Sequence, residues 1–235
     1  MVTKNINRVL TVIIPVFNEE NTILHLVSEV CKQNLVNQII IVDDGSTDKT
    51  SEFLKSFYGK RKIFILTHDK NYGKGAAIRT ALPFINSPFV IIQDADLEYS
   101  PLEYRKLVNP LLNNKADIVL GSRFQSGEQR RILYFWHYIG NRFLTTISNI
   151  FTNLNLSDME TCFKVMRSEI FKSLNLNENG FGIEPEIIAK ISRHDWRIYE
   201  VGISYFGRTY AEGKKITWKD GLRAIYCIVK YNIFR

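Results

Sequence analysis

The sequence predicts an α/β fold in which a mainly parallel sheet is covered by helices on both faces. Short apolar runs rich in β-branched residues alternate with segments of helical spacing, as expected for strands and helices that take turns along a chain. The run from Ile39 to Val42 is apolar at every position, which is typical of a parallel strand buried on both faces. The predicted strands are residues 9–14, 38–42, 62–66, 89–92 and 116–120.

Composition and charge bound the classes of function. With 235 residues, 45% of them hydrophobic, the chain can bury a sizeable core. The net charge of +7 favours anionic partners, and nucleic acid, acidic lipid and phosphorylated small molecules all qualify. Residues 1–8 lead straight into the first strand without a cleavable leader, so the mature protein is expected to begin at Met1.

The cysteines and histidines do not suggest a metal centre. The cysteines are odd in number and far apart, which favours reduced thiols in a cytosolic setting. The histidines lack any H-x-x-x-H spacing, so we expect ordinary surface or core residues. These residues are Cys31, Cys162, Cys227, His25, His68, His137 and His194.

Polar segments follow four of the predicted strands. Open α/β sheets bind ligands in the crevice at the carboxyl ends of their strands. Because parallel strands bring these ends to one edge, we expect the four segments to form one site. They are residues 15–20, 43–46, 94–96 and 121–123.

Asp94 and Asp96 directly follow the apolar run at 88–92. Side chains two residues apart in an extended segment point the same way, so both acids can face one hard cation such as Mg²⁺ or Mn²⁺. Such a cation would offset charge on a departing diphosphate. Taken alone, the pair is more often a solvated turn or a helix cap.

Two further motifs have both a structural and a binding interpretation. Ser46 to Asp48 can cap the next helix, whereas Asp43 and Asp44 could accept hydrogen bonds from a ribose or base. In residues 71–77, backbone N–H groups and Lys74 could meet phosphate, or the glycines could simply form a turn into a helix. The motif is neither a Walker A loop nor a dinucleotide fingerprint, which disfavours a nicotinamide enzyme.

The order of these motifs resembles glycosyltransferase family 2. The resemblance rests on residues 12–20, 42–48, 71–75 and 93–98 and spans roughly residues 9–220. More narrowly, residues 121–124, 157–164 and 212–215, together with Arg208, are similar to the dolichyl-phosphate mannose synthase and polyprenyl-phosphate glycosyltransferase branch. The resemblance implies a GT-A fold, a nucleotide-sugar donor of the GDP-mannose or UDP-glucose type, a divalent metal and inversion at the anomeric carbon.

The resemblance also implies a set of site residues. Asp94 and Asp96 would carry the metal and diphosphate and, with Arg123 and Asp158, form the catalytic set. Glu98 stands where relatives can have Gln as a further metal ligand. The implied donor-binding residues are Pro15, Val16, Asn18, Glu20, Asp43, Asp44, Lys74, Gln93, Asp94, Ala95, Arg208 and Lys215.

The chemistry of a phosphate acceptor is consistent with this set. A lipid phosphate is largely dianionic at neutral pH, so it can attack the sugar carbon without a strong general base. Arg123 and Arg131 could hold that phosphate through forked hydrogen bonds. Asp158 could be a base for a hydroxyl acceptor or could orient the arginines, and both roles stay open. Glu184 and Glu186 could serve catalysis or compensate the helix that follows them.

The second half of the chain suggests contact with a membrane surface. No run of about 18 uninterrupted apolar residues exists, and the segment at about 130–153 is expected to be an acceptor-side interfacial helix. We expect a catalytic domain at 1–215 and an amphipathic helix at 216–235. Its apolar stripe could pack on the core, a partner subunit or a membrane. The stripe is Leu222, Ile225, Tyr226, Val229 and Ile233, flanked by Lys219, Arg223 and Lys230.

The sequence therefore predicts a peripheral enzyme at the cytoplasmic face of a membrane that transfers a hexose to a polyprenyl phosphate, either dolichyl or undecaprenyl. Its partners would be the nucleotide sugar, the lipid phosphate, the membrane and either a separate membrane protein or a second copy. One alternative is a family 2 enzyme acting on a soluble or polysaccharide hydroxyl. Another is a noncatalytic membrane- or RNA-binding module, although acidic strand ends argue against nucleic acid in the crevice.

Overall fold

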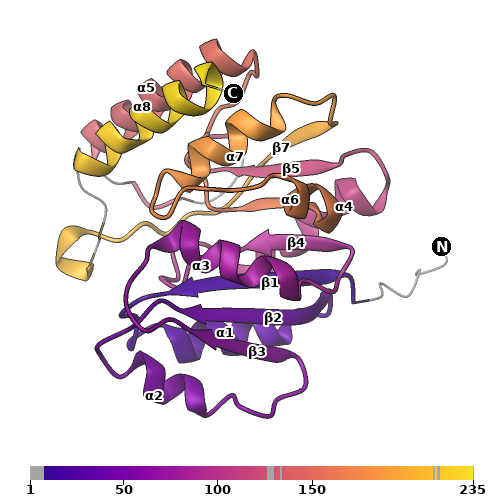
Figure 1. The fold of residues 1–235 in the computed structure, drawn as a ribbon, viewed down its shortest axis with the longest axis vertical. Coiled ribbons are helices and arrows are strands. Elements are labelled where there is room, and N and C mark those ends of the chain that lie inside the picture. The colour runs from indigo at the N-terminus through magenta and orange to yellow at the C-terminus, as the bar shows by residue number, and fades with distance from the viewer. Residues whose placement is uncertain (1–7, 126–129, 133, 214, 216–217, 235) are drawn as a thin grey trace.

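The computed structural model describes residues 8–125, 130–132, 134–213, 215 and 218–234. They contain a seven-stranded sheet in the order β3-β2-β1-β4-β6-β5-β7 (Figure 1). β6 runs antiparallel to its neighbours β4 and β5, and the other pairings are parallel. The strands are β1 Leu10–Val16, β2 Val36–Asp43, β3 Ile63–Thr67, β4 Phe89–Ile92, β5 Ile118–Ser122, β6 Lys164–Arg167 and β7 Ile198–Gly202.

Helices cover the sheet on both faces, which confirms the predicted fold class. In Figure 1, α3 lies in front of β1 and β2, whereas α1 lies behind them. The helices are α1 Ile23–Lys32, α2 Thr50–Lys55, α3 Lys74–Ala81, α4 Tyr104–Leu112, α5 Phe135–Thr152, α6 Ser168–Ser173, α7 Ile183–Ile191 and α8 Trp218–Ile233, with short 3-10 turns at Leu82–Phe84, Pro101–Glu103 and Tyr210–Glu212.

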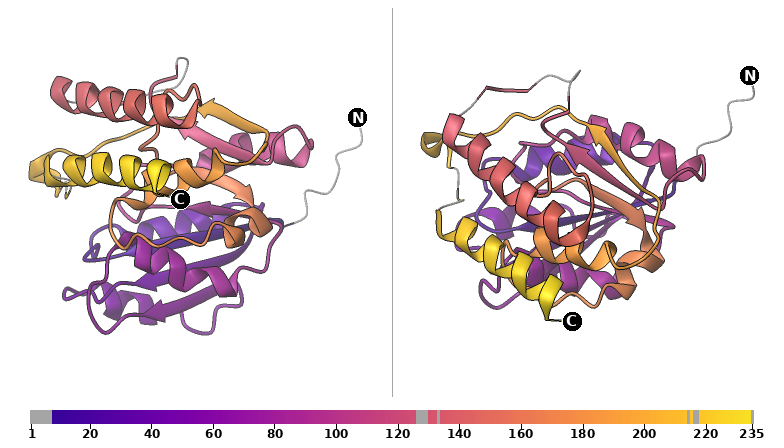
Figure 2. Two further views of the ribbon diagram at one scale, coloured as in Figure 1. Left: turned by 45° about the horizontal axis from the view of Figure 1, so that its top comes forward. Right: turned by 90° about the horizontal axis from the view of Figure 1, so that it is seen from above.

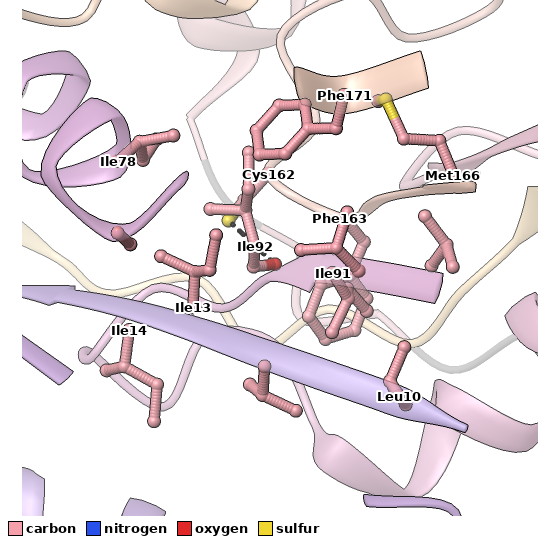
Figure 3. Packing of buried hydrophobic residues seen from close by; sticks show 14 of the residues in the cluster. Leu10, Ile13, Ile14, Ile78, Ile91, Ile92, Cys162, Phe163, Met166 and Phe171 are labelled. Atoms are coloured by element: carbon pink, nitrogen blue, oxygen red, sulfur yellow. Dashed lines mark hydrogen bonds between the residues drawn. The ribbon is translucent and has the colours of Figure 1, made fainter. Parts of the chain in front are cut away.

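The core lies along β1, β2 and β4, where β-branched residues suit a sheet buried on both faces. Ile13 of β1 pairs with Ile40 of β2 on one side and Ile92 of β4 on the other, and all three are buried. Phe163 and Phe171 join the same apolar cluster from the second half of the chain (Figure 3). One continuous core therefore supports both halves of the sheet.

β6 and β7 were not among the predicted strands. β6 is four residues long and begins and ends on the charged Lys164 and Arg167, so it lacks an apolar run. In β7 the side chains are only partly buried, and Tyr199 is exposed. Both strands owe their structure to pairing with β5, a long-range contact that local composition does not reveal.

The α8 helix packs beside α5 and over α7 (Figure 2). The predicted stripe is not the buried face, because Leu222, Tyr226 and Ile233 are exposed. The residues buried on α8 are Ala224, Cys227, Ile228 and Tyr231. The three cysteines of the chain are free thiols, as predicted.

Glu178, in the segment before α7, anchors α8 to the rest of the protein. Its carboxylate accepts hydrogen bonds from Arg223 at 2.6 Å, Tyr231 at 2.7 Å and Lys230 at 3.0 Å. Burial by itself would raise the pKa of Glu178. The hydrogen bonds outweigh that effect and bring its pKa down to about 2. Its ionised form is therefore part of the native packing.

We predict that Glu178→Gln destabilises the protein by about 1 to 2 kcal/mol at pH 7, after allowing for the solvent exposure of Arg223 and Lys230. The folded pKa is depressed, so this stabilisation is complete above about pH 4.5 and is lost as pH falls toward 2. Thermal unfolding followed by circular dichroism should separate the two proteins at pH 7 and bring them together in acid. The control variant Glu52→Gln changes an exposed residue and should unfold at the same temperature as wild type. A loss of stability in Glu178→Gln that did not depend on pH would contradict a stabilising role for the ionised Glu178 carboxylate.

Candidate active site

The polar segments after β1, β2 and β4 meet at one edge of the sheet. Val16, at the end of β1, pairs with Asp43 at the end of β2, and the Asp44 N–H donates to the Val16 carbonyl at 2.8 Å. The Gln93 N–H donates to the Ile13 carbonyl at 2.9 Å, which places Asp94 just beyond the same edge. The segments after these three strands therefore converge as expected, whereas the fourth segment, residues 121–123, follows β5, which β6 separates from β4.

Asp94 and Asp96 are both partly exposed to solvent at this edge. Asp94 forms an ion pair with Lys74 at 2.7 Å, and the Asp96 carboxylate lies 3.5 Å from the Arg208 guanidinium. Burial, with the charges of Asp94 and Glu98, raises the pKa of Asp96 to about 8 against the opposing effect of Arg208. The edge thus carries more negative charge than its own basic residues offset, which suits a cation.

Within the described residues, no group of three or more His, Cys, Asp or Glu side chains is arranged to hold a metal ion. Two carboxylates are nevertheless sufficient for Mg²⁺ when substrate phosphates and water complete the shell. Asp94 and Asp96 provide hard oxygen atoms and unbalanced negative charge, so their donor set fits a divalent cation shared with a diphosphate.

Glu98 follows Asp96 and contacts the segment 205–208. Its Oε1 accepts the Arg208 N–H at 2.7 Å, and its Oε2 accepts the Tyr205 hydroxyl at 2.6 Å. Both oxygens hold the segment 205–208 against the sheet edge. Glu98 therefore positions Arg208, and its role as a further metal ligand stays a prediction.

Asp43 and Asp44 are buried, and their carboxylates accept hydrogen bonds from backbone N–H groups of the neighbouring loops. Asp44 accepts hydrogen bonds from the Tyr72 and Gly73 N–H groups at 2.9 and 2.7 Å and lies 2.7 Å from Nδ1 of His68. Asp43 accepts from the Ser46 N–H at 3.0 Å and from the Ser51 hydroxyl. Their oxygens are thus already engaged by the protein, and their predicted contact with a ribose or base stays a prediction.

Capping explains only part of the Ser46 to Asp48 motif. The Asp48 carboxylate accepts the Thr50 N–H at 2.9 Å in the first turn of α2. The Ser46 hydroxyl instead accepts the Asn18 N–H at 3.0 Å. The Glu20 carboxylate accepts the Lys49 N–H at 2.9 Å. Asn18 and Glu20 therefore tie the loop after β1 to the loop after β2.

The glycines at 73 and 75 serve close packing. A Cβ on Gly75 would overlap the Glu178 carbonyl, and one on Gly73 would lie 2.5 Å from the Asn179 carbonyl oxygen. The Ala76 N–H donates to that Asn179 carbonyl at 3.0 Å. The Gly73 N–H donates to Asp44, so the amides of Gly73 and Ala76 are engaged by the protein, and phosphate binding by this motif stays a prediction.

Gln93 and Ala95 flank Asp94 but are buried. The Gln93 amide accepts the Tyr104 hydroxyl at 2.6 Å and donates to the Asp94 and Tyr99 carbonyls at 3.0 and 3.2 Å. Its side chain therefore holds the turn that presents Asp94, and it does not reach the surface of the edge.

Glu19 is a central residue that the sequence did not single out. It accepts two hydrogen bonds from Arg208, at 3.0 and 3.2 Å, and one from Lys215 at 2.9 Å. Lys215 also donates to the carbonyls of Phe17 and Asn18. Glu19 thus binds the segment 208–215 to the end of β1. Lys214, part of the same motif, lies outside the described residues.

Arg123 is fixed by Asp158. Its Nε and Nη2 each donate to a carboxylate oxygen at 2.7 Å, and its backbone N–H adds a bond of 3.0 Å. Asp158 is fully buried. Burial alone would lower the pKa of Arg123, but the Asp158 carboxylate raises it above its ordinary value. Of the two roles left open for Asp158, orientation of Arg123 is the one supported by this geometry.

Arg131 is held differently, on the surface. Its Nη1 donates to Glu212 at 2.7 Å and to the Gly207 carbonyl at 3.3 Å, and nearly half of its side chain is exposed. Arg123 and Arg131 therefore have separate carboxylate partners. The 207–212 segment connects Arg131 to the region around Arg208.

Glu184 and Glu186, at the start of α7, have distinct surroundings. Glu186 accepts the Asn177 and Glu178 N–H groups, both at 2.8 Å, and pairs with Lys190 at 2.7 Å. Glu184 instead pairs with Lys74 at 2.7 Å, and the same ammonium group pairs with Asp94 at 2.7 Å. Glu186 thus holds the segment before α7, whereas Glu184 is linked through Lys74 to Asp94, and a catalytic role for either residue stays a prediction.

Comparison with known proteins identifies the family. A model described as Glycosyl transferase family 2 matches residues 11–174. An uncharacterised protein of Methanocaldococcus jannaschii is 27% identical over 228 residues, covering 95% of this chain and 92% of that protein. A dolichol-phosphate mannosyltransferase of Pyrococcus furiosus is 27% identical over 228 residues, and glycosyltransferase AglJ of Haloferax volcanii is 26% identical over 201 residues.

These last two alignments cover 94% and 84% of this chain but only 64% and 63% of the relatives. Among solved structures, glucosyl-3-phosphoglycerate synthase of Mycobacterium tuberculosis, in complex with Mn²⁺, UDP and phosphoglyceric acid, is similar with a TM-score of 0.73. It is 19% identical, and the match covers 97% of this chain and 80% of that one. This similarity confirms the GT-A fold. The chain belongs to glycosyltransferase family 2.

Proposed function

We propose that this protein transfers a hexose from a nucleotide sugar to a polyprenyl phosphate, with inversion at the anomeric carbon. The observation that carries the choice of acceptor is the Arg123–Asp158 pair. Asp158 is fully buried, and both of its carboxylate oxygens accept hydrogen bonds from Arg123. It is therefore poorly placed to deprotonate a hydroxyl. A phosphate acceptor needs no such base. The relative from Pyrococcus furiosus that is called a dolichol-phosphate mannosyltransferase supports the same acceptor class.

The donor diphosphate would lie at the edge formed by Asp94 and Asp96. A divalent cation held there would neutralise charge on the leaving diphosphate. Arg208 and Lys215 both contact Glu19 beside this edge. The Arg208 guanidinium and the Lys215 ammonium group would therefore bind oxygens of the donor diphosphate. The complex of the similar structure with Mn²⁺ and UDP is consistent with this arrangement.

The acceptor phosphate would bind Arg123. A guanidinium carries five N–H donors, and the bond to Asp158 uses only Nε and part of Nη2. No described residue accepts a hydrogen bond from Nη1, so its donors would bind a phosphate in an orientation that Asp158 fixes. An acceptor phosphate oxygen then forms the bond to the anomeric carbon while the bond to the nucleoside diphosphate breaks. Arg131, bound to Glu212, would assist from the surface.

The paired helices α5 and α8 support access to a lipid. Both expose aromatic and aliphatic side chains, and they lie side by side (Figure 2). Aromatic residues with basic neighbours such as Arg142 and Lys219 are typical of an interfacial surface. Among the described residues, no helix is long and apolar enough to cross a bilayer. The exposed side chains are Phe135, Trp136, Phe143, Ile150, Trp218, Leu222, Tyr226, Ile233 and Phe234.

Asp96→Asn should weaken metal-dependent binding of UDP or GDP by at least about tenfold, because it removes a charged oxygen ligand. Isothermal titration calorimetry with and without Mn²⁺ measures this directly. The exposed Asp195→Asn is the matched control and should bind as wild type does. Equal affinity of Asp96→Asn and wild type in the presence of Mn²⁺ would remove Asp96 from the proposed site.

Asp158→Asn should destabilise the fold by about 3 kcal/mol, because it leaves a nearly buried guanidinium without its counter-charge. Thermal unfolding measures this loss, and Arg131→Gln, which breaks an exposed pair, should cause little change. Transfer should fall without a change in the shape of the pH–rate profile. Loss of the acidic limb of that profile in a stable Asp158→Asn variant would instead identify Asp158 as a base.

The acceptor itself is tested by a direct competition. Purified protein with Mn²⁺ or Mg²⁺ and a panel of nucleotide hexoses is offered undecaprenyl or dolichyl phosphate in vesicles, 3-phosphoglycerate, or a soluble saccharide. We expect a lipid-linked hexose, and Arg123→Gln should reduce its formation at least about a hundredfold. Efficient transfer to 3-phosphoglycerate or to the saccharide, with the lipid phosphate unchanged, would refute the polyprenyl assignment.

A further inference from the structure

Tyr205, three residues beyond the end of β7, lies against the Arg123 guanidinium. The Cζ atom of Arg123 is 5.2 Å from the centre of the Tyr205 ring and 5.4 Å from the centre of the Phe124 ring. At such distances a guanidinium is attracted to an aromatic ring. Asp158 holds one edge of the same guanidinium by hydrogen bonds. A group held at one edge can still tilt, and the ring contacts limit that tilt.

The hydroxyl group of Tyr205 contacts the donor side of the site. It donates to Oε2 of Glu98 at 2.6 Å. The backbone N–H of Glu98 in turn donates to the Asp96 carboxylate at 3.0 Å. Contacts therefore run without a gap from the donor edge to the acceptor guanidinium, through Asp96, Glu98, Tyr205 and Arg123.

The backbone around Tyr205 is anchored to both sides as well. The Tyr205 carbonyl accepts the N–H of Arg131 at 2.9 Å, and the Phe206 N–H donates to the Glu98 carbonyl at 3.0 Å. The Tyr205 ring also packs edge-on against the ring of Tyr99, with 5.3 Å between the centres. Tyr205 is therefore held in one place by contacts with the turn after β4 and with the segment that carries Arg131.

The hydroxyl and the ring of Tyr205 have separable roles. Packing against Tyr99 and Arg123 requires only an aromatic ring, which phenylalanine would also provide. The hydroxyl joins that ring to Glu98, which lies 107 positions away in the chain. Because Glu98 is buried and closely follows Asp96, its carboxylate is a fixed point on the donor side. The hydroxyl therefore ties the position of the ring beside Arg123 to the donor edge.

We propose that Tyr205 is a positioning residue that holds the Arg123 guanidinium at a fixed distance from the donor edge. The inference rests on the proposed function, because it takes Arg123 as the group that binds the acceptor phosphate. Reacting atoms must approach to about 3 to 3.5 Å before a bond forms between them. Tyr205 sets that approach through Arg123 and does not itself touch the reacting atoms.

Tyr205→Phe tests this role, because it removes the hydroxyl and keeps the ring. We expect the kcat for hexose transfer to a polyprenyl phosphate to fall about tenfold, as a displacement of less than an ångström predicts. Affinity for UDP or GDP in Mn²⁺, measured by calorimetry, should stay within about twofold, because the hydroxyl is not part of the diphosphate site. Tyr199→Phe removes a hydroxyl from an exposed tyrosine on β7 and should match wild type in both measurements.

A double-variant cycle with Arg123→Gln separates positioning from a general structural effect. If Tyr205 acts through Arg123, loss of its hydroxyl has little further effect once the guanidinium is gone. The double variant should then transfer hexose within about twofold of Arg123→Gln alone. A radiolabelled donor makes these low rates measurable. Tyr205→Leu, which removes the ring as well, carries the same cycle if thermal unfolding shows that Tyr205→Phe does not fold.

The outcomes distinguish this inference from the proposed function. The positioning role is refuted, and the proposed function stands, if Tyr205→Phe transfers hexose as fast as wild type or loses nucleotide affinity in proportion to its rate. It is equally refuted if the loss recurs in full in the Arg123→Gln background. If wild type transfers no hexose to polyprenyl phosphate, the proposed function fails, and the positioning role fails with it.

Discussion

The position of the Lys74 ammonium group is the interaction on which the rest of the site depends. It neutralises Asp94 at the end of β4 and Glu184 at the start of α7 together, so it joins the two halves of the protein at the sheet edge. It reaches both because α3 begins unusually close to the segment 178–180. Only glycine at positions 73 and 75 permits that approach.

The same segment has a second role on its other side. Glu178 binds three donors of α8, and that helix packs beside α5. The sheet edge, α7 and the exposed α5 and α8 surface are thus connected through a few buried carboxylates. A lipid substrate that approached along these helices would meet a site whose geometry is set by the core of the protein.

Most charges at the edge are paired with one another. Glu19 binds Arg208 and Lys215, and Asp158 binds Arg123. Buried pairs of this kind contribute little net stability but hold each group in one orientation. Asp94 lies beside Lys74 and Asp96 lies near Arg208, yet both carboxylates remain partly exposed at the edge.

The local sequence by itself determined the α/β class, the first five strands and the polar character of their carboxyl ends, because apolar β-branched runs specify buried strands without reference to distant residues. Only the tertiary structure decided that β6 enters the sheet antiparallel, that Glu98 holds Tyr205 and Arg208, and that Glu19 joins Arg208 to Lys215. It alone placed Lys74 between Asp94 and Glu184 as the partner of both. These relationships join residues far apart in the chain, and long-range contacts of this kind leave no periodic pattern in the local sequence.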